Sequence, residues 1–309
     1  NTAAASGSIG MLIRMNDTSS SIRNTVRGLE VQAWTGSNTF GINTGIAAFG
    51  RTFGIQGTTN ATAAGKQVPA AIIADLAWLG LHHDAFMRQS ERMARYGAAI
   101  DDLKSRGLLY PCYETAEELD LKRKVQLGRG KPPVYDRAAL KLTDAQKQTY
   151  TDNGIAPHWR FLFTHETVAW RDLVHGDVAI HTQNLSDPVL VRADGQPLYT
   201  LPSICDDIDL GVTHVIRGED HLTNTAVQIQ LFKAMGAGAP VFGHFPMLTG
   251  AGGEALSKRL GSLGVEDLRE DGLEPMALNS LLARLGTSDP VEPRQTMDAL
   301  VAGFDITHI

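Results

Sequence analysis

The hydrophobic pattern changes character near residue 69. Residues 1–68 are rich in Gly, Ser, Thr, Asn and Ala and poor in charge, and short apolar alternations recur between glycines at 28–33, 40–46 and 53–58. Alternation with a period of two, bounded by turn residues, predicts short β-strands and here suggests a weak repeat. We therefore expect this first segment to be β-rich or disordered.

From residue 69 the chain becomes more charged, and its apolar residues recur with helical spacing. Glycines such as Gly80 and Gly236 close several of these segments, as is common at helix ends. The pattern predicts helices over 70–80, 90–108, 223–235 and 274–285, a hairpin over 187–201, and strands over 212–216 and 245–248. Strands that alternate with helices favour an α/β sheet with ligands at its carboxyl edge.

Composition narrows the class of protein. Of the 309 residues two are cysteines, Cys112 and Cys205, so we expect neither a zinc knuckle nor a disulfide framework, and a reducing cytoplasm is the expected location. No apolar run reaches the length of a membrane span, and no signal peptide is visible. The first residue is Asn1 rather than Met, which suggests a fragment.

Basic residues cluster within 121–141 although the net charge is −6. This stretch holds seven basic residues and a single acidic one, Asp136. The basic residues are Lys122, Arg123, Lys124, Arg129, Lys131, Arg137 and Lys141. The sequence alone favours a solvated helix end and loop, and the alternative is contact with RNA phosphates.

A candidate phosphate-binding loop lies at 255–259, directly after the glycine turn 250–253. A lysine supplies a mobile charge, a serine supplies a donor, and glycines let the backbone approach a phosphate. Alone, this loop reads as solvated polar sequence. Its meaning depends on the block 214–225, which lies about forty residues upstream.

Eight motifs in this order and spacing resemble bacterial glutamyl-tRNA synthetase, a class I aminoacyl-tRNA synthetase, over residues 70–309. They lie at 78–80, 88–92, 109–119, 158–161, 186–190, 194–199, 205–221 and 256–259. The resemblance implies an incomplete Rossmann-like nucleotide fold with an inserted acceptor-end domain and a following helical region. The implied division is an atypical segment 1–68, the end of the first Rossmann half plus the insert over 69–186, the second half with the lysine loop over 187–260, and a stem-contact region over 261–309, truncated before an anticodon-binding domain.

The family activates glutamate with ATP and Mg²⁺ as substrate and transfers it to tRNA(Glu). We expect no protein-bound zinc in this chain. By resemblance, Lys258 and Ser257 stabilise the departing pyrophosphate, and ATP also meets Leu256, Arg259 and Asp220. Alanine replaces the first lysine of the usual loop, at Ala255, which we expect to weaken loop closure. The resemblance further implies a monomer in the cytoplasm, and contacts with tRNA from Lys122, Arg123, Lys124, Arg129 and Lys131.

The glutamate substrate calls for a guanidinium, because an arginine fork fits a carboxylate. By resemblance Arg217 and Tyr199 contact glutamate. The structural alternatives are an ion pair of Arg217 with Glu219 or Asp220, and a half-buried core position for Tyr199. His221 and His244 are interpreted as packing residues, since this chemistry needs no histidine base.

Residues 1–68 do not match the family. Its N-terminal signature, Pro-x-Pro-Thr-Gly followed by His-x-Gly-His or a close variant, is absent there, and so is its Arg-Ile-Glu-Asp-Thr-Asp stretch. We therefore expect impaired activity in a chimeric gene product or fragment. Three alternatives stay open: a paralogue that glutamylates a modified tRNA base, a non-catalytic tRNA-binding protein, and an adhesive protein defined by its β-rich first segment, which loosely resembles phage tail or adhesin repeats. Salt-dependent tRNA binding without ATP–pyrophosphate exchange would favour the second.

Overall fold

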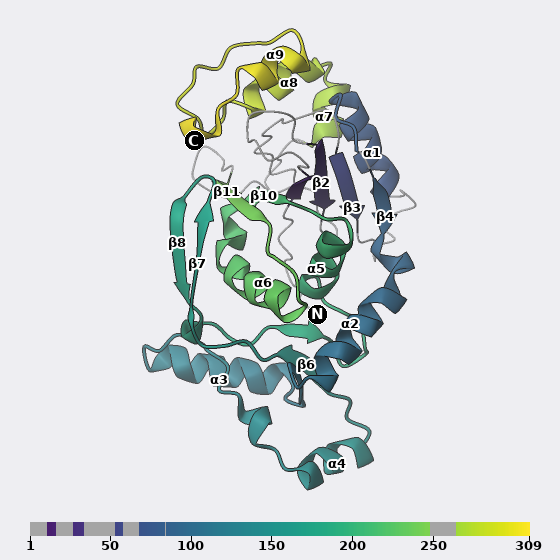
Figure 1. The fold of residues 1–309 in the computed structure, drawn as a ribbon, viewed down its shortest axis with the longest axis vertical. Coiled ribbons are helices and arrows are strands. Elements are labelled where there is room, and N and C mark those ends of the chain that lie inside the picture. Colours follow the sequence, from purple (N-terminus) through teal and green to yellow (C-terminus); the bar gives the residue numbers. More distant parts are fainter. Residues whose placement is uncertain (1–10, 17–26, 34–52, 58–67, 84, 248–263) are drawn as a thin grey trace.

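The computed structural model describes six stretches of the chain, namely residues 11–16, 27–33, 53–57, 68–83, 85–247 and 264–309. In the described part, the segment 116–152 lies at one end of the molecule and the helices of the C-terminal segment lie at the other (Figure 1). A large sheet and its flanking helices connect the two ends.

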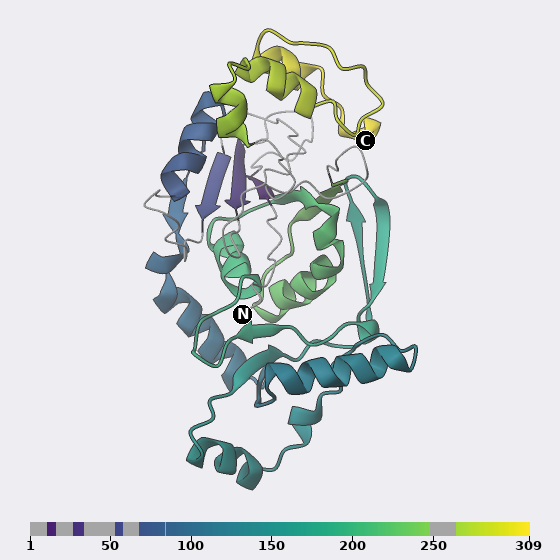
Figure 2. The same cartoon turned by 180° about the vertical axis from the view of Figure 1, so that it is seen from behind.

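The large sheet is mixed and has the strand order β4-β3-β2-β1-β10-β11-β7-β8. In chain order its strands are β1 (Met11–Asn16), β2 (Arg27–Ala33), β3 (Phe53–Gly57), β4 (Phe86–Arg88), β7 (Thr167–Asp172), β8 (Gly176–His181), β10 (His214–Gly218) and β11 (Val241–Phe245). Strands β10, β11 and β7 run parallel, so their carboxyl ends lie at one edge. The β7–β8 hairpin runs along one side of the molecule (Figure 2).

The N-terminal strands extend this sheet. Strand β1 pairs antiparallel with β10, with Ile13 opposite Ile216, and β2 and β3 follow on its other side. The strands predicted at 28–33 and 53–58 therefore match β2 and β3, and the expected β-rich character is confirmed for them. Strand β1 was not predicted, and the alternation at 40–46 lies outside the described residues.

A small antiparallel sheet has the order β5-β6-β9, formed by β5 (Leu109–Cys112), β6 (His158–Phe161) and β9 (Val189–Val191). Between β5 and β6 the chain forms α3 (Ala116–Gly128) and α4 (Asp144–Asp152). Each of these helices begins with a capping box, in which a threonine and the side chain three residues later satisfy one another's backbone N–H groups.

Seven further helices cover the described part of the chain. They are α1 (Val68–Trp78), α2 (Met93–Ser105), α5 (Thr200–Asp209), α6 (Leu222–Ala234), α7 (Val265–Glu270), α8 (Pro275–Leu282) and α9 (Met297–Ala302). Helices α1, α2, α6 and α8 confirm the four predicted helices. Gly80 follows α1 with φ +71° and Gly236 follows α6 with φ +74°, the left-handed conformation that glycine adopts without strain. Within the described ranges, no helix has the length and apolar character needed to cross a membrane.

Alternating residues of β10 enter two different cores. Val215 packs in the main core with α2, α5 and α6, whereas Ile216 packs in a second core with Leu278 of α8. A strand buried on both faces is expected for the parallel part of an α/β sheet. This alternation places Arg217 on the same face of the sheet as Val215.

Three sequence predictions need correction. The strand expected over 245–248 is instead Val241–Phe245, because Pro246 has no N–H to continue the ladder. The second arm of the predicted hairpin is one bridge, Val191 to Pro197, after which the chain enters α5. Helix α6 begins at Leu222, before the predicted caps, because the turn Glu219–His221 leads directly into it.

Candidate functional site

Arg217 is the penultimate residue of β10, at the edge where three parallel strands end. It is 3% exposed. Its Nε donates a hydrogen bond to Nε2 of His244 at 3.1 Å, and its Nη2 donates to Oγ1 of Thr225 at 2.5 Å and to Oε1 of Gln228 at 2.6 Å. These bonds tie the guanidinium to β11 and α6 and fix the plane of its fork.

The ring of His244 joins Arg217 to a buried carboxylate. Nδ1 of His244 lies 2.6 Å from Oδ2 of Asp172, and both side chains are fully buried. Burial alone would raise the pKa of Asp172, but the bond from His244 and backbone N–H groups, including those of Val174 and His175, hold it well below its ordinary value. Burial lowers the pKa of His244, and the charge of Arg217 acts in the same direction.

Tyr199 and Asp220 lie around His221. Tyr199 immediately precedes α5, is half-buried, and packs against the main core, with its ring centroid 6.2 Å from that of His221. Nη2 of Arg217 also approaches the carbonyl oxygen of His221 at 3.4 Å. Asp220 is exposed, and its Oδ2 lies 3.7 Å from Nε2 of His221. The structure therefore gathers three predicted site residues near one edge of the sheet.

His221 gives this region a measurable acid sensitivity. Burial, and then the charge of Arg217, lower its pKa from 6.5 to about 4. The unfolded chain binds this proton near pH 6.5 and the folded chain does not, so the free energy of unfolding should fall as the pH drops from about 6.5 to about 4. We expect His221→Gln to remove about 1–3 kcal/mol of that fall in urea unfolding curves.

His165→Gln is the matched control, because this exposed ring meets water in the folded and the unfolded chain alike. It should leave the dependence of unfolding on pH as it is in the unaltered chain. An unchanged dependence in His221→Gln would contradict the burial of the neutral ring.

The predicted phosphate-binding residues Leu256, Ser257, Lys258 and Arg259 lie outside the described residues. The described residues break off at Met247, two residues after β11 ends at Phe245, and resume at Gly264. The assignment of these four residues to ATP therefore stays a prediction.

The predicted tRNA-contact residues lie in α3 and in the turn after it. Lys122 forms ion pairs with Glu114 at 3.5 Å and with Asp136 at 3.3 Å, and Lys124 pairs with Asp120 at 2.6 Å. The other three members of the set, Arg123, Arg129 and Lys131, are exposed. Part of the positive charge counted in the sequence is thus neutralised within the protein.

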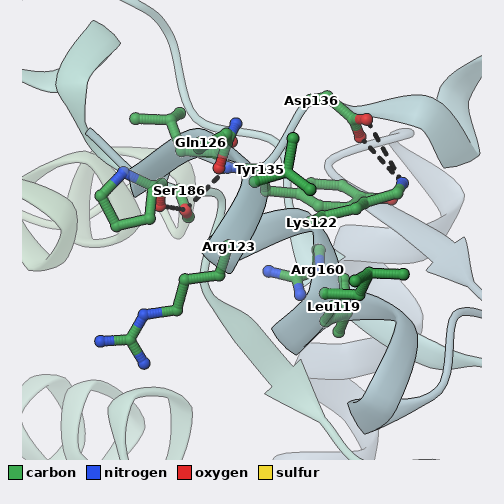
Figure 3. Close-up of a pocket in the computed structure, with 12 residues that line it drawn as sticks. Leu119, Lys122, Arg123, Gln126, Tyr135, Asp136, Arg160 and Ser186 are labelled. Carbon is green, nitrogen blue, oxygen red and sulfur yellow. Dashed lines mark hydrogen bonds and ion pairs between the residues drawn. The ribbon is translucent and has the colours of Figure 1, made fainter. Parts of the chain in front are cut away.

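A cavity of about 630 Å³ lies beside this basic stretch, between α3 and the segment 133–136. Figure 3 shows Lys122 turned toward Asp136, while Arg123 extends away from both. The guanidinium of Arg160 lies under the ring of Tyr135, with its Cζ 4.2 Å from the ring centroid. Basic and apolar side chains thus share the lining of this cavity.

The sequence did not indicate that Asp172, Thr225 and Gln228 belong to the site around Arg217. It also did not indicate that His244 orients Arg217. Asp172 and His244 are 72 positions apart in the chain, so no local pattern links them. Thr225 and Gln228 are three residues apart on α6 and therefore lie on one face of the helix. Two polar residues at this spacing were the only local sign that this face carries part of the site.

Comparison with known proteins points to one family. Residues 57–301 match the family model described as tRNA synthetases class I (E and Q), catalytic domain. The chain is 56% identical over 242 residues to glutamate–tRNA ligase 1 of Maricaulis maris, covering 78% of this chain and 54% of that protein. It is 58% identical over 236 residues to glutamate–tRNA ligase of Azospirillum brasilense, covering 76% of this chain and 53% of that protein.

Two solved structures support the same assignment. A glutamate tRNA ligase from Elizabethkingia meningosepticum in complex with its amino acid aligns with a TM-score of 0.71 and 26% identity, covering 84% of this chain and 59% of that one. Glutamate-tRNA synthetase from Elizabethkingia anophelis aligns with a TM-score of 0.71 and 27% identity, covering 84% and 60%. The chain spans about half the length of the curated relatives described above. The predicted α/β, Rossmann-like synthetase fold is confirmed.

Proposed function

Because the chain belongs to the class I tRNA synthetases of the glutamate and glutamine group, we propose that it carries the glutamate-binding part of a glutamate–tRNA ligase. The observation that carries this proposal is Arg217, a buried guanidinium held in place at the carboxyl edge of the sheet. Its fixed positive charge suits the side-chain carboxylate of glutamate, and Tyr199 lies across His221 from it.

The proposed reaction begins with the attack of the glutamate α-carboxylate on the α-phosphate of ATP, which arrives with Mg²⁺ and loses pyrophosphate. The acyl group of the adenylate then passes to the terminal ribose of tRNA(Glu). In such a reaction the protein positions its substrates and stabilises the negative charge that develops on the phosphates. We assign that charge stabilisation to Lys258 and Ser257, and contacts with ATP to Asp220, Leu256 and Arg259.

The acceptor end of tRNA would meet the basic residues of α3 and the turn after it. Arg123, Arg129 and Lys131 are exposed and are therefore the members of the predicted set best placed to approach phosphates. The proposal keeps the insert within 69–186, the lysine loop within 187–260 and a stem contact within 261–309. It also keeps a monomer that acts in the cytoplasm.

We further propose that adenylate formation by this chain is slow. The matched region begins at residue 57, and residues 1–68 do not carry the N-terminal signature that the family places beside the ATP phosphates. A helix N-terminus at that position would supply backbone N–H donors to the phosphates. The loss of preorganised donors of this kind commonly slows a reaction about 100-fold or more.

ATP–pyrophosphate exchange with glutamate tests both parts of the proposal. We expect exchange that depends on glutamate, runs about 100-fold or more below that of a complete relative, and disappears in Lys258→Ala. Exchange at the rate of the complete relative would contradict the impairment. Tight tRNA binding with no exchange at any glutamate concentration would favour the non-catalytic alternative.

A further inference from the structure

A buried chain of polar groups crosses three neighbouring strands behind the proposed glutamate site. Asp172 ends β7, His244 lies in β11, and Arg217 lies in β10, and the three side chains are bonded in that order. Their residues are 2%, 0% and 3% exposed. Such a chain has few ways to distribute its protons, because water cannot supply alternative partners.

The proton on His244 can be assigned from its neighbours. Arginine is a donor at every nitrogen, so Nε2 of His244 must accept the bond from Nε of Arg217. The ring proton is therefore on Nδ1, where Oδ2 of Asp172 accepts it at 2.6 Å. The hydroxyl of Thr225, 2.9 Å from Nε2, is compatible with the same tautomer because it can donate to that nitrogen as well.

The second oxygen of Asp172 is held just as firmly. Its Oδ1 accepts hydrogen bonds from the backbone N–H groups of Val174 at 3.0 Å, His175 at 3.2 Å and His244 at 3.1 Å. These donors fix which oxygen faces the histidine ring. The carboxylate thus has two distinct edges, one for the backbone and one for Nδ1.

We infer that Asp172 and His244 are positioning residues for glutamate, in that Asp172 holds His244 in the Nδ1–H tautomer and His244 thereby fixes the plane of the Arg217 guanidinium. The inference rests on the proposed function. Neither residue touches the substrate in this arrangement, and each acts through Arg217. The bonds to His244, Thr225 and Gln228 take up the Nε–H and the two Nη2–H groups, so a fixed guanidinium plane also fixes the direction of Nη1. A fixed plane spares the cost of ordering the guanidinium at each binding event.

The variant Asp172→Asn distinguishes this role from simple packing. The three backbone N–H groups would keep the amide oxygen at the position of Oδ1, which leaves the amide NH₂ facing Nδ1 of His244. The ring would then carry its proton on Nε2 and present a donor to the Nε–H of Arg217. This substitution preserves the volume of the side chain but reverses the donors and acceptors along the row Asp172, His244 and Arg217. A tautomer change has the same effect in other histidine–carboxylate pairs.

Asp177→Asn is the matched control. Asp177 lies on the other strand of the β7–β8 hairpin, pairs with Arg171 at 2.9 Å, and both side chains are exposed. The same chemical change there should leave both the histidine ring and ligand binding as they are. Thermal unfolding of both variants establishes that each is folded at the temperature of the assay.

The experiment joins ring-nitrogen spectroscopy with calorimetry on the full chain labelled with ¹⁵N-histidine. In long-range ¹H–¹⁵N spectra near pH 7.5 we expect His244 to show a protonated Nδ1 and a bare Nε2, and Asp172→Asn to exchange the two. Titration with L-glutamate should give about 10- to 100-fold weaker binding in Asp172→Asn, the effect of one lost hydrogen bond to a charged group. Asp177→Asn should bind as the unaltered chain does.

The two arms separate failure of the inference from failure of the proposed function. An Nε2–H ring or an imidazolium in the unaltered chain would overturn the positioning role, whatever binds. Unaltered glutamate affinity in a folded Asp172→Asn variant would overturn it as well. A chain with the expected Nδ1–H ring that binds no glutamate would instead overturn the proposed function, and with it the role assigned to the pair.

Discussion

Replacing Arg217 with lysine should weaken glutamate binding by about 100-fold. A lysine ammonium is a point charge on a flexible stem, so its N–H groups are not held in one plane as those of the guanidinium are. It would also leave acceptors at Thr225, Gln228 and His244 without the three bonds that the guanidinium makes. Isothermal titration with L-glutamate measures the effect.

Arg192→Lys is the matched control for this substitution, because Arg192 is exposed directly after β9 and the variant keeps the positive charge. We expect it to bind glutamate as the unaltered chain does. A folded Arg217→Lys variant that binds glutamate with an affinity within about twofold of that of the unaltered chain would contradict the prediction. The side-chain carboxylate of glutamate would then bind at another residue.

Replacing Asp206 with alanine should lower the free energy of unfolding by about 3 kcal/mol. Asp206 lies in α5 with no exposed side chain, and it accepts hydrogen bonds from Nε of Arg92 at 2.7 Å, from the hydroxyl of Tyr96 at 2.8 Å and from Nε2 of Gln89 at 3.2 Å. The substitution leaves these three donors without their acceptor at the contact between α2 and α5. Urea unfolding followed by circular dichroism measures the loss.

Asp209→Ala provides the comparison, because Asp209 lies on the same helix and also pairs with Arg92 and Arg95. Its side chain is 29% exposed, so water replaces the lost partner and the expected cost is below about 1 kcal/mol. Equal losses in the two variants would contradict the view that burial of Asp206 gives this contact its strength. Because α5 begins directly after Tyr199, the Asp206 variant should also bind glutamate more weakly.

Helices could be predicted because their signals are local. Apolar spacing predicted α1 and α2, and Gly80 ends α1 in the left-handed conformation, with φ +71°. Helix α2 spans Met93–Ser105, inside the predicted limits of 90 and 108. The strand after α6 was displaced by several residues in the prediction. An apolar run predicts that a strand exists, whereas its limits depend on the neighbouring strand and on Pro246.

The candidate site could be predicted only as far as motifs identify single residues. Arg217 and Tyr199 were assigned by resemblance, and the structure brings both close to His221. The bonds that hold Arg217 come from residues on β11 and α6, whose positions follow from the pairing of strands and not from the sequence around the arginine. The hydrogen bond between Asp172 and His244 likewise depends on the pairing of strands β7 and β11 and not on the local sequence.

Calorimetric titration of the unaltered 309-residue chain with L-glutamate and with L-glutamine tests the central claim most directly. If Arg217 receives a side-chain carboxylate, glutamate should bind about 10-fold or more tightly than glutamine, because the amide lacks the charge that the guanidinium meets. Equal affinity for the two amino acids, or no binding of glutamate, would contradict a glutamate site built around Arg217.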